Sequence, residues 1–131
     1  MRKNWKYPRK AIPCGAARRA RMAVDLGSYG PAAFGGEQVP RPAAVVMGYT
    51  GHTRYTENDP PTFAVVSLDD PIASPRVMER RITALNAAGV DTEFHLYRNA
   101  GHGFGVGTGT DAEGWIDYAI HFWEQHLTKK K

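Results

Sequence analysis

The ten residues from Thr62 to Pro71, TFAVVSLDDP, carry the pattern that decides the fold. They begin with a nearly continuous apolar run and end in two aspartates before a proline. A short apolar run of this kind is typical of a strand that is buried on both faces of a parallel sheet. A similar run, AAVVMGY, occupies residues 43–49. Two such strands need helices on both faces, so the sequence predicts an α/β layer structure.

Helical patterns precede and follow this pair of predicted strands. An Ala- and Arg-rich stretch at residues 16–26 predicts a short helix that Gly27 closes with a positive φ. Downstream, Ser74 followed by Pro75 is a good N-cap and first-turn pair, and we expect the helix that it begins to end at Gly89. The second helix therefore lies directly after the buried strand.

A third strand and a last helix complete the pattern. Residues 92–99, TEFHLYRN, alternate between apolar and polar positions, which predicts a less buried edge strand. Thr110 and Glu113 have the spacing of a capping box. The helix that follows is expected to pack on the sheet through apolar residues at helical spacing: Trp115, Ile116, Ala119, Ile120, Trp123 and Leu127. The predicted fold thus has about three parallel strands, flanked by helices and joined by right-handed crossovers.

Composition and charge divide the chain into two regions. The length of 131 residues indicates one domain, which we assign to residues 16–131, preceded by a basic arm at residues 1–15. Residues 1–24 carry eight Lys or Arg and no acidic residue. One cysteine excludes an internal disulfide, and no apolar run is long enough for a membrane span, so we expect a cytoplasmic protein without membrane contact.

Polar residues follow two neighbouring strands of the predicted sheet. Asp69 and Asp70 come directly after the strand that begins at Thr62, and His102 lies in the glycine-rich stretch NAGHGFG after the next strand. Sites in open parallel sheets form beyond the carboxyl ends of the strands. An acid after one strand and a histidine after the next is the order in which a carboxylate orients a general base. We expect Asp70 and His102 to approach within hydrogen-bond distance.

Four segments of the chain resemble a known family. The segments RPAAVVMGYTGH, PPTFAVVSLDDPIAS, AAGVDTEFHLYRNAGHGFGVGTGT and AEGWIDYAIHFWEQHL are similar to the C-terminal half of α/β-hydrolase esterases of the acetyl-xylan-esterase and feruloyl-esterase-like group. The resemblance implies that Asp70 is the triad acid and His102 the base. It leaves Asp69 as a neighbour that caps the turn. It also implies an enzyme that hydrolyses small acyl or acylated-sugar esters without a cofactor or metal.

The same resemblance shows a departure at the nucleophile. Members of the group carry G-x-S-A-G-A-R-M where this chain has GAARRARM at residues 15–22, so Ala17 stands at the serine position and Arg19 at the second glycine. Ser28 in LGSYG is the candidate substitute, because Gly30 follows it as in a nucleophile elbow. Cys14 is a second candidate, as an activated thiol. Neither matches the motif fully, and the nucleophile stays open.

Three hypotheses about function follow from these residues. The first is a carboxylic-ester hydrolase that uses Asp70, His102 and an uncertain nucleophile. The second is a catalytically inactive or truncated homologue of such enzymes. The third is a nucleic-acid-associated protein that uses the basic arm, although no zinc-ligand spacing or RNA-binding aromatic motif supports it. The strand that begins near Ala43 lacks the neighbour that a longer family member would supply, so we also expect a homo-oligomer through an exposed strand edge.

Overall fold

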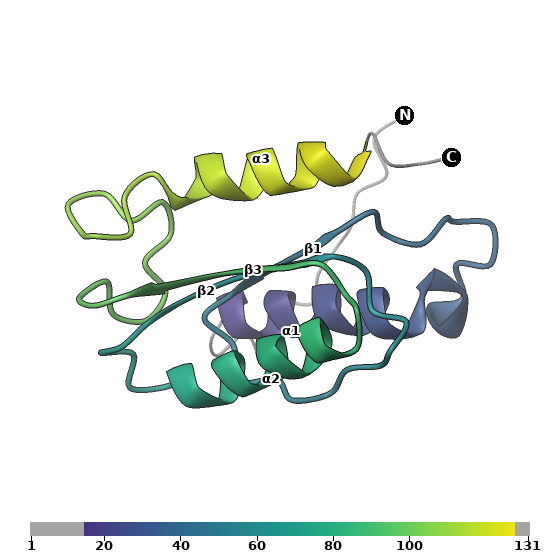
Figure 1. Ribbon diagram of the computed structural model, residues 1–131, viewed down its shortest axis with the longest axis horizontal. Coiled ribbons are helices and arrows are strands. Elements are labelled where there is room, and N and C mark those ends of the chain that lie inside the picture. Colours follow the sequence, from purple (N-terminus) through teal and green to yellow (C-terminus); the bar gives the residue numbers. More distant parts are fainter. Residues whose placement is uncertain (1–14, 128–131) are drawn as a thin grey trace.

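The fold has three layers, with helices on both faces of a parallel sheet (Figure 1). The computed structural model describes residues 15–127, and of residues 15–20 only the backbone. The elements follow one another as α1 (Gly15–Tyr29), a 3₁₀ turn (Pro31–Phe34), β1 (Val45–Gly48), β2 (Thr62–Ser67), α2 (Pro75–Ala87), β3 (Thr92–Tyr97) and α3 (Trp115–Leu127). This element order and the fold class agree with the sequence-based prediction.

The sheet of the described residues has the order β1-β2-β3, with all strands parallel. Thr62 pairs with Val45 on one side and with Thr92 on the other, so the three strands start in register. Strand β2 is central and buried along its whole length, which explains its nearly continuous apolar sequence. As the alternating pattern of residues 92–99 predicted, β3 lies at an edge.

The alternation of side chains along β2 builds two cores. Phe63 and Val65 point to the face that α3 covers, whereas Ala64 and Val66 point to the face that α1 and α2 cover. Trp115 and Phe122 of α3 join the first pair. The remaining buried apolar residues of the other face are Val24, Val45, Met47, Ala73, Met78, Ile82, Leu85 and Val90. Both faces of the central strand are therefore sealed from water.

The end of α1 differs from the prediction. The helix does not stop before Gly27 but continues to Tyr29, and Gly30 takes the positive φ, at 78°. Gly27 serves a different purpose, because a β-carbon at this position would lie 2.6 Å from Cγ2 of Val45. The glycine thus permits close approach of α1 to β1 instead of ending the helix.

The start of α3 also differs from the prediction. Thr110 and Glu113 form no capping box, since α3 begins only at Trp115. Thr110 donates its hydroxyl to the Gly107 carbonyl, and the Glu113 carboxylate accepts from the Gly109 N–H instead of the Thr110 N–H. The pair stabilises the turns that precede the helix.

The packing face of α3 is narrower than its sequence suggested. Its buried residues are Trp115, Ala119, Phe122 and His126. Three apolar residues that were expected to pack on the sheet are exposed instead, namely Ile120, Trp123 and Leu127. The helix therefore has an apolar outer side, and the expectation that Trp123 packs on the sheet is wrong.

Residues 49–61 connect β1 to β2 without a helix. This crossover returns over the α1 and α2 face and is held there by buried polar contacts. Nε2 of His52 lies 3.0 Å from Oδ1 of Asp25 in α1, and Nη2 of Arg81 in α2 donates to Oδ2 of Asp59 at 3.0 Å. Burial lowers the pKa of His52, although the neighbouring Asp25 carboxylate opposes this shift. Side-chain contacts thus hold this crossover where a helix would do so in other α/β folds.

Candidate active site

Asp70 and His102 meet at the carboxyl edge of the sheet. Asp70 follows β2 and His102 follows the neighbouring β3, so their loops lie side by side. Nδ1 of His102 lies 2.8 Å from Oδ2 of Asp70. The Asp70 side chain is buried, while 15% of the His102 side chain remains exposed. The structure therefore brings together the acid and the histidine that the sequence singled out.

The Asp70 carboxylate is fixed by the start of the following segment. Its Oδ1 accepts hydrogen bonds from the backbone N–H groups of Ile72 and Ala73, each at 2.8 Å. Its second oxygen is thereby directed toward the histidine ring. This arrangement explains why the aspartate stands directly before the Pro71 turn that leads into α2.

The contact with Asp70 selects the tautomer of His102. A carboxylate can only accept, so Nδ1 carries the proton and donates it, and the lone pair of the neutral ring lies on Nε2. Within residues 15–127, the His102 side chain hydrogen-bonds Asp70 and no serine or threonine. A nitrogen lone pair held in this way at the rim of a sheet can accept a proton from an attacking hydroxyl group or water.

Tyr49 is a site residue that the sequence reasoning missed. It comes directly after β1, and its ring meets the His102 ring edge-on, with centroids 5.2 Å apart. Its φ of 34° is the only positive value at a non-glycine residue in the described range. Strained backbone of this kind recurs at functional sites. Its position at a strand end could have drawn attention to Tyr49, because His102 and Asp70 were found by that rule.

Ser28 does not lie near this pair. It occupies the last turn of α1, and the neighbouring Gly27 lies against Val45 and Pro60, at the amino ends of β1 and β2. The His102 ring instead contacts Tyr49, past the carboxyl end of β1. At about 3.3 Å per strand residue, these two positions are about 13 Å apart along the strand. Figure 1 shows the end of α1 and the loop after β3 at opposite ends of the sheet.

The structure describes only one of the other two positions considered for the nucleophile, Ala17 and Cys14. Ala17 lies in the first turn of α1. Cys14 falls outside the described residues, as does nearly all of the basic arm. The described part of the chain therefore brings Asp70 and His102 together, and no serine or threonine of residues 15–127 hydrogen-bonds the His102 side chain.

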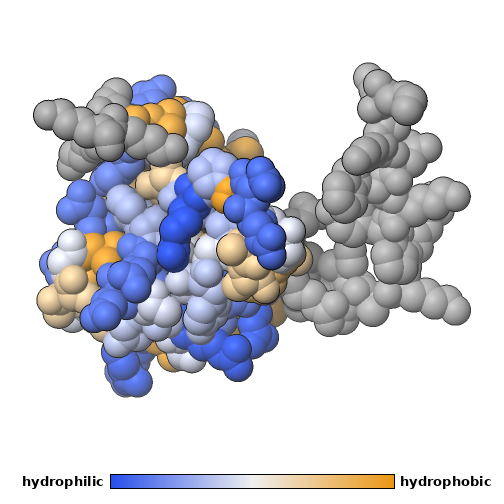
Figure 2. All heavy atoms as spheres, turned by 90° about the vertical axis from the view of Figure 1, so that its right-hand side faces the viewer, coloured by the Kyte–Doolittle hydropathy of each residue, from blue (hydrophilic) through white to orange (hydrophobic). Residues whose placement is uncertain are grey.

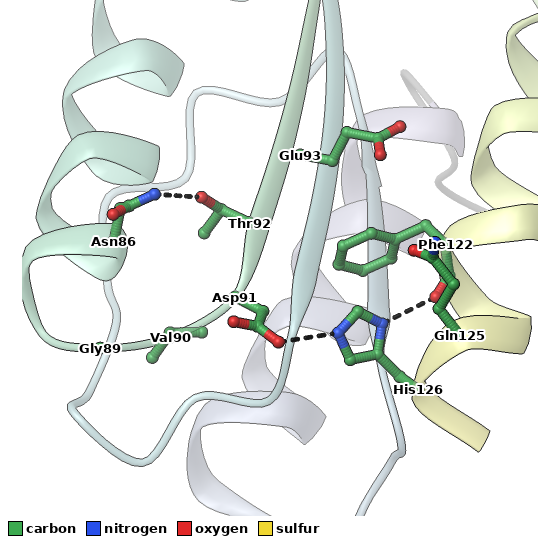
Figure 3. Close-up of a pocket in the computed structure, with 9 residues that line it drawn as sticks. All are labelled: Asn86, Gly89, Val90, Asp91, Thr92, Glu93, Phe122, Gln125 and His126. Carbon is green, nitrogen blue, oxygen red and sulfur yellow. Dashed lines mark hydrogen bonds and ion pairs between the residues drawn. The ribbon is translucent and has the colours of Figure 1, made fainter. Parts of the chain in front are cut away.

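A cleft of about 640 Å³ lies near the amino ends of the strands, between the ends of α2 and α3 (Figure 3). His126 stands in its wall with both ring nitrogens occupied, Nδ1 by the Phe122 carbonyl and Nε2 by Asp91. Figure 2 looks onto this end of the molecule, which is mainly hydrophilic. Because its histidine has no free nitrogen, this cleft is a poorer candidate for proton transfer than the His102 site.

Two further findings concern metals and membranes. No group of three or more His, Cys, Asp or Glu that could hold a metal ion occurs within the described residues. In the same part of the chain, no helix combines the length and the apolar character that a membrane span requires.

The three-stranded parallel sheet with helices on both faces corresponds to part of an α/β hydrolase fold. The chain belongs to the prolyl oligopeptidase family, whose model matches residues 22–130. Its fold resembles the crystal structure of MGS-M1, an α/β hydrolase enzyme from a Medee basin deep-sea metagenome library, with a TM-score of 0.66 and 22% identity. The match covers 83% of this chain and 51% of MGS-M1, so this chain spans about half the length of that protein.

A second solved structure matches less well. It is a protein from Klebsiella pneumoniae assigned as a dienelactone hydrolase, with a TM-score of 0.38 and 20% identity over 65% of this chain and 40% of that one. A comparison with curated protein sequences gives no match.

Proposed function

We propose that this chain supplies the acid–base half of a carboxylic-ester hydrolase. The observation that carries the proposal is the 2.8 Å contact between Asp70 and Nδ1 of His102, which leaves Nε2 as the base. Membership of the prolyl oligopeptidase family supports hydrolytic chemistry in general. Asp70 orients the ring and stabilises the imidazolium that forms when Nε2 accepts a proton.

The proposed reaction uses water as the attacking group, because Ala17 stands at the nucleophile position. Nε2 of His102 takes a proton from water while the water oxygen attacks the acyl carbon. The tetrahedral intermediate then collapses, the bond to the leaving alcohol breaks, and the imidazolium returns its proton to the departing oxygen.

The proposed substrates are esters of small acyl groups, including acylated sugars, as the resemblance to acetyl-xylan and feruloyl esterases implies. An alkoxide is a better leaving group than an amide nitrogen, so a site without a positioned nucleophile is better suited to esters than to peptides. The assay is therefore hydrolysis of p-nitrophenyl acetate, with p-nitroacetanilide as the matched amide. Turnover of the ester above buffer supports the proposal, whereas turnover of the amide alone contradicts it.

The alternative is a homologue without catalytic activity. It is favoured by Ala17 at the nucleophile position and Arg19 at the position of the second elbow glycine. Both replacements affect the chemical step and leave the fold intact. Inert protein in the ester assay, with intact folding by circular dichroism, supports this alternative.

Ser28→Ala tests the site that the LGSYG motif suggested. We expect ester turnover to stay unchanged, because Ser28 lies at the opposite end of the sheet from His102. The hydroxyl is buried and has no hydrogen-bond partner among the described residues. Its removal should therefore leave the free energy of unfolding unchanged or raise it by up to about 1 kcal/mol. A loss of turnover in the folded variant would identify Ser28 as the nucleophile and contradict the water mechanism.

We also propose that the chain forms a homo-oligomer through the free edge of β1. Strand β1 pairs only with β2 among the described residues, and an edge strand of this kind is a template for pairing with another chain. Val46 on this strand is 37% exposed. Light scattering should show a species larger than a monomer, and Val46→Lys should shift it toward the monomer. A monomeric wild-type protein at high concentration would contradict the proposal.

A further inference from the structure

Asp69 forms a second set of contacts to the loop that carries His102. Its Oδ1 accepts the backbone N–H of Gly101 at 2.9 Å and the hydroxyl of Ser67 at 2.5 Å. The Ser67 oxygen in turn accepts the backbone N–H of Ala100 at 3.0 Å. The two backbone N–H groups that directly precede His102 are thus both held by residues at the end of β2.

The loop at His102 needs such support because of its sequence. Gly101 and Gly103 flank the histidine with φ values of 70° and 69°. Glycines reach this conformation without strain, but they also reach many others, so a loop of this composition is not fixed by its own backbone. The contact with Asp70 orients the ring of His102, but it does not determine the path of the preceding backbone.

We propose that Asp69 is a positioning residue for His102, acting through Gly101 and, with Ser67, through Ala100. The two adjacent aspartates then have separate roles, because Asp69 holds the backbone before the histidine and Asp70 holds its ring. This inference rests on the proposed role of His102 as a base. It gives the SLDD stretch a function beyond the single triad acid.

The charge state of Asp69 suits this role. The hydrogen bond from Ser67, and after it the one from Gly101, lower the pKa of the Asp69 carboxyl below its usual value. The carboxylate therefore stays ionised at the neutral pH of an ester assay. Because Asp69 is exposed, we expect its removal to loosen the loop without unfolding the domain.

The test compares Asp69→Ala with Asp69→Asn, with Glu124→Gln as the control at an exposed carboxylate of α3. Alanine removes the acceptor, whereas asparagine retains one side-chain oxygen for Gly101. For Asp69→Ala we expect amide hydrogen exchange of Gly101 to accelerate about tenfold or more, the Nδ1 proton resonance of His102 to broaden, and kcat to fall about tenfold with little change in KM. Asp69→Asn should lie closer to wild type in all three measurements.

The exchange and resonance measurements do not depend on turnover. They decide the role of Asp69 even if the wild-type protein hydrolyses no ester, which would instead count against the proposed function. Unchanged Gly101 exchange in Asp69→Ala would overturn the proposal. A kcat loss that Asp69→Asn shares in full, with normal Gly101 exchange, would also overturn it, because the effect would then arise from charge and not from loop position.

Discussion

Replacement of His102 by alanine is expected to lower kcat/KM for p-nitrophenyl acetate by about 10²- to 10⁴-fold, the range that a positioned general base contributes. The reason is that Nε2 of His102 is the nitrogen left free by the 2.8 Å contact of Nδ1 with Asp70. Asp70→Asn should lower kcat/KM in the same direction, since an amide that donates toward Nδ1 favours the wrong tautomer. Steady-state kinetics at neutral pH measure both effects.

The matched control is His121→Ala. His121 is exposed on α3 and pairs with Gln125 of the same helix, away from the carboxyl edge of the sheet. The kcat/KM of the His121→Ala variant should equal that of the wild-type protein. If His102→Ala and His121→Ala retain equal ester turnover, the observed hydrolysis does not use the Asp70–His102 pair and the proposed function is wrong.

The fold was predictable because its strongest sequence signal is the burial of β2. A strand covered on both faces is mostly apolar, and the run from Thr62 to Ser67 is buried throughout, with polar side chains only at its two ends. The second helix was equally clear, since Ser74 accepts the Val77 N–H and Pro75 begins the helix as expected. Such signals are local, so they need no knowledge of what the strand or helix packs against.

The errors arose where tertiary contacts decided the outcome. Gly27 was expected to end α1, but it permits the approach of Val45, a contact between residues far apart in the sequence. On α3, the apolar residues are spread around more of the helix than the sheet can cover. Trp115 is therefore buried while Trp123 is exposed, and helical spacing alone does not distinguish the two.

The residues considered for the site also fall into two groups, those that the sequence placed correctly and those that it did not. Asp70 and His102 could be paired from the sequence because the carboxyl ends of neighbouring parallel strands meet at one edge. Their catalytic role stays a prediction. Ser28 was proposed from its glycine spacing, which carries no information on which edge of the sheet it reaches. Tyr49 has no motif of its own: its position after β1 was the one available sequence signal, and its backbone conformation and its contact with His102 mark it in the structure.

The sequence did not predict the path of the crossover from β1 to β2. The contacts that hold this crossover to α2 lead to a prediction about the free energy of unfolding. Arg81 is buried on α2, and its Nη2 donates to Oδ2 of Asp59 at 3.0 Å. Its Nη1 also donates to the Arg54 carbonyl, and its guanidinium carbon lies 5.9 Å from the centre of the Tyr55 ring. A single side chain thus contacts three residues of a crossover that has no helix of its own.

Arg81→Met is therefore expected to lower the free energy of unfolding by about 3–5 kcal/mol, because Asp59 would remain as an uncompensated buried carboxylate. Urea unfolding followed by circular dichroism measures the change. Arg80→Met, at the exposed neighbouring position on α2, is the control and should stay within about 0.5 kcal/mol of wild type. A loss below about 1 kcal/mol in Arg81→Met, the size of an ordinary single substitution, would contradict the prediction that Arg81 compensates a buried Asp59 carboxylate.

A double variant separates the lost contact from the stranded charge. Asp59→Asn keeps a side-chain oxygen for the Thr56 N–H, which Oδ1 of Asp59 accepts at 2.8 Å, but it removes the negative charge. If the cost of Arg81→Met comes mainly from the unpaired carboxylate, the double variant should be more stable than Arg81→Met alone, since a neutral amide is less costly to bury. If the double variant is instead less stable by the sum of the two single effects, the loss comes from the contacts to Arg54 and Tyr55, and packing, not charge, holds the crossover to α2.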